Sequence, residues 1–200
     1  MGAEQLPLFG RDPGADELPS FDGLRRIQLD ASSWIDYCGN FVAQHAALFD
    51  RVRATLRFRS ERRTMYEREV DVPRLFTSLP EDGPVPPLLA AVEAALAERY
   101  QASFERIGVA LYRSGDDSVA FHRDHMPRDR TTLVAILSLG TPRKLLVRPH
   151  GGGASRAFRL GWGDLFVMGG MCQAHWEHGI PKQASAAPRM SCVFRHVYEP

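Results

Sequence analysis

Two side chains that commonly bind metals stand two residues apart in the segment F-H-R-D, at His122 and Asp124. If this segment is a β-strand, both point to the same face, because side chains on a strand alternate with period two. One distant histidine would complete a two-His-one-carboxylate set, which suits non-haem Fe(II) and leaves open positions for oxygen. The spacing therefore suggests oxygen chemistry at one iron ion, if the fold supplies the third ligand.

The segment H-W-E-H-G-I-P offers two candidates for that ligand, His175 and His178. In a β-barrel, residues far apart in the chain converge on one mouth because the strands fold back on each other. We favour His178, because G-I-P follows it directly and would end the strand at the rim. His125 has the wrong parity to face the same way as His122 and Asp124.

Cys172, His175 and His178 form C-x-x-H-x-x-H, which also invites a structural zinc interpretation. Structural zinc usually has four ligands, commonly with two thiolates close together, and the sequence offers no second pair. On a strand, His175 and His178 would moreover face opposite sides. The zinc interpretation is therefore the weaker one, and ordinary core histidines remain the alternative for either site taken alone.

Two arginines close the same half of the chain, Arg189 and Arg195 in A-P-R-M-S-C-V-F-R. Their even separation puts them on one face of the predicted strand. An arginine that faces a β core is costly unless it meets an anion. A dicarboxylate co-substrate that lies along the strand would satisfy both guanidinium groups.

The segment from Arg51 to Arg74 is dense in arginine, and four acidic residues partly offset it. Two interpretations stay open: a solvated strand face, or a ridge that contacts phosphates, since arginine donates two hydrogen bonds at once to phosphate oxygens. The arginines are Arg51, Arg53, Arg57, Arg59, Arg62, Arg63, Arg68 and Arg74.

The N-terminal half is predicted to hold two helices that support a β core. Ala31 to Phe49 is predicted as the first, with Asp30 or Ser32 as N-cap. Pro86 to Tyr100 is predicted as the second, because proline begins it and Ala and Leu continue it. The apolar stripes would be Trp34, Tyr37, Phe41 and Leu48 in the first helix, and Leu89, Val92, Leu96 and Tyr100 in the second.

Around these helices we expect short extended segments and one loop. Leu24 to Leu29 is predicted as a strand, and T-L-R-F-R as another with Leu56 and Phe58 facing inward. The stretch V-D-V-P-R-L-F-T-S-L-P-E-D-G-P-V-P-P is predicted to be a proline-rich loop.

After Tyr100 the pattern changes to about eight short strands with turn signals between them, which indicates a sandwich or barrel. We predict a mainly β fold with supporting N-terminal helices, a double-stranded β-helix or jelly roll. Residues 1–20 would form an arm, with Leu6 to Phe9 docked on the body, and 21–200 one domain. Within it, 21–105 would give helical support and nucleotide recognition, and 106–200 the jelly-roll core. The strands are expected at 107–112, 119–122, 132–139, 144–148, 157–160, 164–168, 175–178 and 190–197.

Composition sets broader limits on this chain of 200 residues. An apolar fraction of 44% fits a protein with a buried core, and a net charge of +1 means that any surface for nucleic acid must be local. Three cysteines without a C-x-x-C pair favour a reducing compartment. With no signal peptide or membrane span recognised, we expect a cytoplasmic monomer.

Five segments together resemble the AlkB-type Fe(II)/2-oxoglutarate dioxygenases, which undo N-alkylation of nucleic-acid bases. They are L-Y-R-S-G-D-D-S-V-A-F-H-R-D, S-L-G-x-P-R-x-L, G-D-L-F-V-M-G-G, H-W-E-H-G-I-P and A-P-R-M-S-C-V-F-R. The similarity covers Val109 to Val197 well and the N-terminal half loosely.

The resemblance implies a site and a reaction. His122, Asp124 and His178 would be the catalytic iron ligands, with O2 and 2-oxoglutarate as the further reactants. Arg189 would hold the distal carboxylate of 2-oxoglutarate and Arg195 would lie nearer its other end. Tyr112 would hydrogen-bond the co-substrate. The implied reaction is demethylation of bases of the 1-methyladenine or 3-methylcytosine type in DNA or RNA, which releases formaldehyde, succinate and CO2.

The chain departs from the family pattern at two places. The usual N-x-Y is A-L-Y here, so with Ala110 one hydrogen bond to the co-substrate is either missing or supplied by another residue. His125 and Met126 stand where family members often carry an acid that helps to recognise the damaged base. Residues expected to contact the substrate are Phe76, Tyr66, Arg74 and Met126. The alternative is a jelly-roll oxygenase of the same kind that hydroxylates a protein side chain or a small metabolite.

Overall fold

The structure is a computed structural model that describes residues 18–65 and 68–197, with the side chains of 61–72 and 105 left out. The predicted docking segment, Leu6 to Phe9, and the candidate Tyr66 therefore lie outside the described residues. So does the side-chain placement of Arg62, Arg63 and Arg68, which belong to the proposed phosphate ridge.

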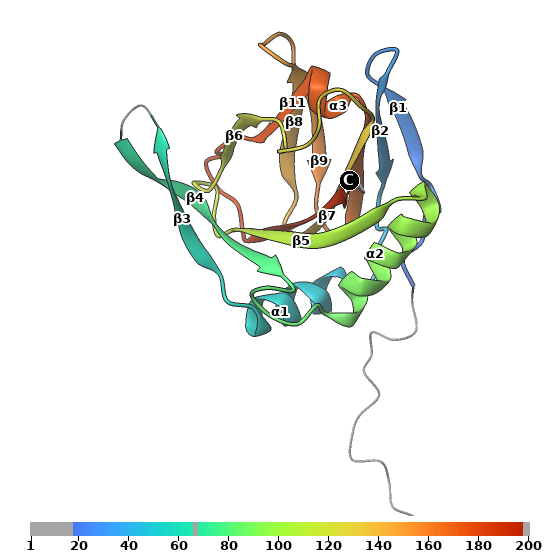
Figure 1. Cartoon of the computed structure of the whole chain (residues 1–200). Coiled ribbons are helices and arrows are strands. Elements are labelled where there is room, and N and C mark those ends of the chain that lie inside the picture. Colours follow the sequence, from blue (N-terminus) through green and yellow to red (C-terminus); the bar gives the residue numbers. More distant parts are fainter. Residues whose placement is uncertain (1–17, 66–67, 198–200) are drawn as a thin grey trace, which may run out of the picture.

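Two antiparallel sheets face each other, as expected for a jelly roll (Figure 1). Across the large sheet the order is β1 (Arg25–Gln28), β2 (Ser33–Cys38), β10 (Asp164–Gly170), β7 (Thr132–Gly140), β12 (Arg189–Val197), β5 (Ser103–Tyr112), β4 (Arg68–Leu79) and β3 (Arg59–Met65). Across the small sheet it is β6 (Val119–His122), β11 (Trp176–Ile180), β8 (Arg143–Pro149) and β9 (Arg156–Leu160).

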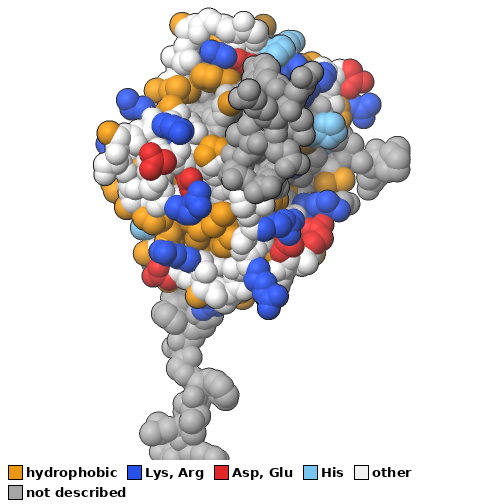
Figure 2. Space-filling view, turned by 90° about the vertical axis from the view of Figure 1, so that its left-hand side faces the viewer, with side chains coloured by type: hydrophobic (Ala, Val, Ile, Leu, Met, Phe, Trp, Pro, Cys, Tyr) orange, Lys and Arg blue, Asp and Glu red, His pale blue; other side chains and the backbone are white. Residues whose placement is uncertain are grey.

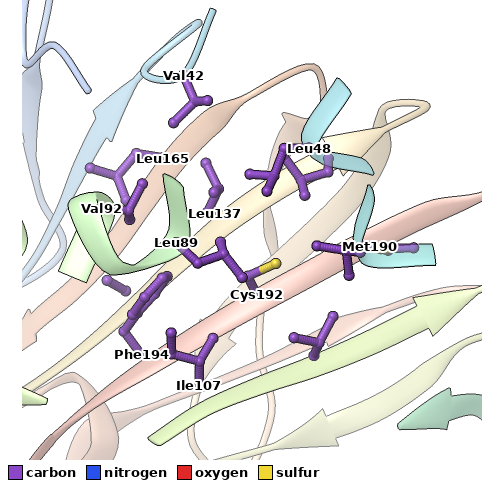
Figure 3. Close-up of a cluster of buried hydrophobic side chains, with 14 of the residues drawn as sticks. Val42, Leu48, Leu89, Val92, Ile107, Leu137, Leu165, Met190, Cys192 and Phe194 are labelled. Atoms are coloured by element: carbon purple, nitrogen blue, oxygen red, sulfur yellow. The ribbon is translucent and has the colours of Figure 1, made fainter. Parts of the chain in front are cut away.

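Two helices, α1 (His45–Thr55) and α2 (Pro87–Tyr100), lie against the outer face of the large sheet (Figure 1). The second confirms the predicted helix, and the side chains of Leu89, Val92 and Leu96 on its inner face are fully buried. They join the larger of the two main hydrophobic clusters, which fills the space between helices and sheet (Figure 3). The predicted support of the sheet by N-terminal helices is therefore confirmed.

Strand β12 shows how alternation divides the chemistry of this fold. Met190, Cys192 and Phe194 are fully buried in the cluster beneath the helices. The residues between them, from Arg189 to Arg195, point to the opposite face, toward the small sheet. The predicted common face of the two arginines follows from this alternation.

The helix predicted over 31–49 is wrong, because β2 occupies its first part and α1 begins only at His45. Strand β2 pairs with β1 on one side and with β10 on the other, and Ile35 and Asp36 are both fully buried. A strand buried on both faces carries apolar side chains without strict alternation, which imitates a helical stripe. Hydrogen bonds stabilise the buried Asp36 carboxylate: Arg26 Nε donates to it at 2.7 Å and the Tyr100 hydroxyl at 2.9 Å.

The proline-rich loop is also wrong in its first part, because β4 continues through Pro73 to Leu79. The pairing of β4 with β3 is irregular between Ser60 and Arg62, which face this part of β4. A proline is tolerated in a strand at such an irregularity, where its missing N–H breaks no regular ladder. Of the expected strand T-L-R-F-R, Thr55 ends α1, residues 56–58 form no helix or strand and Arg59 begins β3, although Leu56 is buried as predicted.

Helix α3 (Cys172–His175) replaces the start of the strand predicted at 175–178, so β11 begins at Trp176. The other predicted strands of the C-terminal half are present, some one to four residues longer. The three cysteines, Cys38, Cys172 and Cys192, are buried and free. Burial raises the pKa of Cys172 and of Cys192 to about 12, which keeps both thiols protonated. Within the described ranges, no helix is long and apolar enough to cross a membrane.

The contact of α2 with the large sheet should dominate the stability of this fold. Replacing Leu89 with alanine removes a fully buried side chain and leaves a cavity, so we expect the free energy of unfolding to fall by about 2–5 kcal/mol. The matched control is Leu18→Ala, at a side chain that is 79% exposed, for which we expect a change within about 0.5 kcal/mol. Urea denaturation followed by circular dichroism measures both, and equal effects would contradict the packing described.

Candidate active site

Neighbouring strands of the small sheet bring two histidines together. His122 ends β6, and His178 lies directly opposite it on β11, with 4.4 Å between the ring centroids. The pairing becomes irregular after His178, where Gly179 lets β6 approach closely. A Cβ at Gly179 would lie only 3.0 Å from the Val119 carbonyl oxygen, a tight contact that favours glycine at this position. The choice of His178 over His175 agrees with this geometry.

Asp124 lies just beyond the end of β6, not on the strand as we expected, yet its carboxylate still reaches the two histidines. The Asp124 N–H donates to Gln173 Oε1 at 2.8 Å, and Arg128 donates to its carbonyl oxygen. Gln173 belongs to α3, which leads into β11. The segment that carries Asp124 is therefore fixed to the element that precedes His178.

The ligand atoms of His122, Asp124 and His178 all lie within 4.8 Å of one another. Arg195 donates to Asp124 Oδ1 from Nε at 2.9 Å and from Nη2 at 2.6 Å. Asp124 Oδ2 is buried without a hydrogen-bond partner, 3.5 Å from His178 Nε2. Two imidazole nitrogens and one unsatisfied carboxylate oxygen form a donor set that fits Fe(II).

The protonation states of this cluster also favour a metal ion. Burial lowers the pKa of His178 to about 4, so its imidazole is neutral at physiological pH. Burial alone would raise the pKa of Asp124, but His178 and Arg195 together hold it below its ordinary value. A neutral imidazole and an ionised carboxylate are the forms that bind metals, so no proton has to be displaced from these two residues.

Arg189 lies fully buried at the other end of β12. Its Nη2 donates to Ser138 Oγ at 2.8 Å, while Nε and Nη1 have no hydrogen-bond partner. Burial lowers the pKa of Arg189 to about 10, which leaves the guanidinium charged at neutral pH. A buried charge with two free donors fits the terminal carboxylate of a dicarboxylate co-substrate.

A cavity of about 60 Å³ lies between the two sheets and includes the metal donors in its wall. Tyr112 lines it, stacked 5.4 Å from the Arg189 guanidinium carbon, and its hydroxyl accepts a hydrogen bond from Arg74 Nη1 at 3.4 Å. Ala110, where the family asparagine is missing, lies directly across from Ser191 on β12. Both line the cavity, so the Ser191 hydroxyl faces the place that the asparagine would serve.

A wider groove of about 660 Å³ adjoins this cavity. Phe76 and Arg195 line both, so the groove leads to the metal donors. Gly108 belongs to its floor: a Cβ there would lie 3.3 Å from the Phe76 ring and from Arg195 Nη1. Met126 and His125 line the groove as well.

The described residues that were predicted to contact the substrate lie in two places. Phe76 and Met126 line the groove, whereas Arg74 lines the inner cavity beside Tyr112. Of the predicted arginine ridge, Arg59 lines the groove, but Arg51 and Arg53 lie on α1, on the outer side of the large sheet. Figure 2 shows Lys and Arg side chains around the face that carries β3, β4 and β6, several with an acidic side chain beside them.

Several residues of the site escaped the sequence analysis. Gln173 and Ser138 act through hydrogen bonds to Asp124 and Arg189, and nothing in their spacing indicates this. Ser191 could have been found, because it shares the parity of Arg189 on the predicted strand. His175, in contrast, is half-exposed beside Asp30 and Ser32 and has no place among the donors.

Comparison with known proteins agrees with this geometry. The family model of the 2OG-Fe(II) oxygenase superfamily matches residues 77–196. The bovine and human proteins named alpha-ketoglutarate-dependent dioxygenase alkB homolog 3 are 33% and 32% identical over 123 residues, which are 56% of this chain and 43% of each relative. An uncharacterised protein of Acanthamoeba polyphaga mimivirus, R406, is 29% identical over 140 residues, 68% of this chain and 73% of that protein.

Solved structures support the fold alone. The structure described as OsALKBH1 superposes with a TM-score of 0.60 at 12% identity and covers 86% of this chain and all of that one. A prolyl-4-hydroxylase of Pseudomonas putida gives a TM-score of 0.56 at 16% identity, covering 83% of this chain and 93% of its own.

This chain belongs to the 2OG-Fe(II) oxygenase superfamily. It is an Fe(II)/2-oxoglutarate-dependent dioxygenase with a His-Asp-His cluster, and its cofactors are Fe(II), 2-oxoglutarate and O2. The chain spans less than half the length of the alkB homolog 3 proteins that it matches.

Removal of one metal donor tests the cluster. We expect His122→Ala to abolish succinate formation from 2-oxoglutarate, because two ligands do not hold Fe(II) in place. Conversion of labelled 2-oxoglutarate under saturating iron measures this, and Mn(II) titration measures metal binding. The matched control is His175→Ala, which we expect to retain turnover. Full activity of His122→Ala would refute the iron assignment.

A second prediction concerns the buried guanidinium. We expect Arg189→Met to lose the thermal stabilisation that 2-oxoglutarate gives the Mn(II)-bound protein, which for the wild type is about 2.7 kcal/mol at a ligand concentration of 100 Kd. The same substitution removes a buried charge with unpaired donors, so the co-substrate-free protein should be no less stable than the wild type. Differential scanning fluorimetry checks both, and retained stabilisation by 2-oxoglutarate would contradict the proposed carboxylate site.

Proposed function

We propose that this protein removes methyl groups from ring nitrogens of nucleic-acid bases by oxidation. The observation that carries the proposal is the groove of about 660 Å³ that leads to the metal donors, with Phe76 at the junction and arginines along its wall. Ligand pockets have volumes of about 300–1,000 Å³, so a flipped base and its sugar are of the right order. An aromatic ring at the entrance can stack on a base, and guanidinium groups can bind phosphates.

The sequence motifs support the same substrate class. The segments around the metal donors resemble the AlkB-type enzymes, and the relatives reported above carry the name alkB homolog 3. The family model, which matches residues 77–196, includes both strands that place the histidines and the strand that places both arginines. It does not include most of the N-terminal half, which contributes β3 and part of β4 to the groove.

Each residue of the cluster has a proposed role. His122, Asp124 and His178 would hold Fe(II), with Arg195 keeping the Asp124 carboxylate oriented. Arg189 would bind the distal carboxylate of 2-oxoglutarate, with the Tyr112 hydroxyl as a further hydrogen-bond partner. Bound iron would supply the oxidising chemistry, in which one oxygen atom of O2 enters succinate as CO2 leaves and the other enters a C–H bond of the methyl group.

The resulting N-hydroxymethyl group breaks its N–C bond, which releases formaldehyde and returns N–H to the base. The base has to leave the stack to reach the metal, at a cost of a few kcal/mol that is lowest for damaged or single-stranded substrate. Arg57 and Arg59 are exposed at the start of β3, where they could hold the phosphates of the flipped nucleotide.

Formaldehyde release from oligonucleotides with 1-methyladenine, 3-methylcytosine or 3-methylthymine tests this function, in DNA and in RNA. We expect the double variant Arg57→Ala/Arg59→Ala to weaken binding of the single-stranded oligonucleotide and to reduce the salt dependence of log Kd by about 1.4, roughly 0.7 for each lost phosphate contact.

The matched control is Arg51→Ala/Arg53→Ala, which removes the same charge from α1. Equal effects of the two double variants would argue against the proposed phosphate contacts. Succinate formation without any formaldehyde from oligonucleotides would instead favour the alternative, hydroxylation of a protein side chain or a small metabolite.

A further inference from the structure

The groove beside the metal-ligand cluster is rich in hydrogen-bond donors. Arg59, Arg106 and Arg195 line it, together with His125 and His196. Each guanidinium carries five N–H donors and no acceptor. Among the described lining residues, the one acidic side chain is Glu81.

The Glu81 carboxylate already interacts with Arg106 and Ser78. Arg106 Nε contacts Glu81 Oε1 at 2.9 Å, and the Ser78 hydroxyl donates to Glu81 Oε2 at 2.8 Å. The hydrogen bond from Ser78 and the charge of Arg106 both hold the pKa of Glu81 below its ordinary value. Glu81 therefore offers little to a positively charged base.

The neighbouring carboxylates are engaged in the same way. Asp82 pairs with Arg59 at 2.5 Å and accepts the Ser78 N–H at 2.8 Å. Asp124 accepts two hydrogen bonds from Arg195 on one oxygen, and its other oxygen belongs to the metal cluster. In the part of the groove that the structure describes, every carboxylate thus has a cationic partner.

The two residues directly after Asp124 add no acid either. His125 and Met126 line the groove at the position where the AlkB-type pattern often carries a carboxylate. The Met126 thioether is an apolar surface with no charge to offer. Together with Phe76, it offers apolar contacts to the ring of a base, while the arginine N–H donors lie on the walls of the groove.

N-methylated bases fall into two chemical kinds. In 1-methyladenine and 3-methylcytosine the carbon beside the methylated nitrogen, C6 or C4, carries an amino group, and the ring is positively charged. In 3-methylthymine and 1-methylguanine the ring carries a carbonyl oxygen at that position, C4 or C6, and is uncharged. Donors on the protein match the carbonyl oxygens of the second kind and repel the charge of the first.

We propose that the groove selects the uncharged, carbonyl-bearing lesions over the cationic ones, an inference that rests on the proposed function. Per turnover, N–CH3, 2-oxoglutarate and O2 give N–H, formaldehyde, succinate and CO2. The ring nitrogen takes its proton from the hydroxyl of the N-hydroxymethyl group. No net proton is released, because lesion and product are both uncharged.

A matched pair of substrates isolates this difference. 3-Methylthymine and 3-methylcytosine place the methyl group on the same ring nitrogen and differ in charge, in the substituent at C4 and in the C5 methyl group of thymine. In one oligonucleotide sequence we expect kcat/KM to be at least about tenfold higher for 3-methylthymine, since a site with unmatched polar groups discriminates by this much or more. A preference for 3-methylcytosine would overturn the inference.

Substitutions in the groove should move this ratio in a defined direction. Met126→Asp adds a carboxylate where the ring would lie, and we expect the preference for 3-methylthymine to fall by about tenfold or more. The control Ala90→Asp adds the same charge on the exposed side of α2, across the large sheet, and should leave the ratio unchanged. An unchanged ratio in Met126→Asp would count against the inference.

A second, independent variant tests the same inference in case Met126→Asp does not fold. Arg106→Gln leaves the exposed Glu81 carboxylate without its arginine, so the ratio should shift toward 3-methylcytosine. The double variant Arg106→Gln/Glu81→Gln should reverse that shift. If no oligonucleotide yields formaldehyde while wild-type protein still forms succinate, the proposed function itself fails. Formaldehyde from both lesions without the expected ratio would refute the selectivity alone.

Discussion

The ion pair between Arg195 and Asp124 joins the two sheets at the point where the chemistry would occur. Arg195 belongs to β12 in the large sheet, whereas Asp124 follows β6 in the small sheet. Both hydrogen bonds go to one carboxylate oxygen, which leaves the other directed at His178. A buried carboxylate keeps its charge here because it has this partner, so the metal cluster depends on the correct packing of the sheets.

Strand β12 supplies both ends of the site because side chains on a strand alternate. One face of β12 carries Arg189, which is buried beside the Tyr112 ring, and Arg195, which pairs with Asp124, while Cys192 on its other face packs beneath α2. A shift of one residue in its pairing would place both guanidinium groups in the hydrophobic cluster. The apolar core under the helices therefore fixes the register on which the polar site depends.

Much of the fold and of the candidate site could be predicted from the sequence. The period of two placed His122 with Asp124 and Arg189 with Arg195, although Asp124 proved to lie beyond its strand. Local patterns failed where tertiary contacts decided: β2 has two buried faces, and β4 tolerates Pro73 at an irregular pairing. Contacts such as that of Gln173 with Asp124 arise only in the folded protein, and no residue spacing in the sequence indicates them.

The unpaired donors of Arg189 have a consequence for the cycle of the enzyme. The carboxylate that we assign to Arg189 is the one that 2-oxoglutarate keeps when it is converted to succinate. Under this assignment the guanidinium would bind reactant and product alike, and only the metal end of the cavity, where the keto acid differs, would distinguish them. Release of succinate would leave the buried charge of Arg189 uncompensated again, so the product would leave slowly. Accumulated succinate would then act as a competitive inhibitor of 2-oxoglutarate. Turnover would in this way depend on the supply of organic acids.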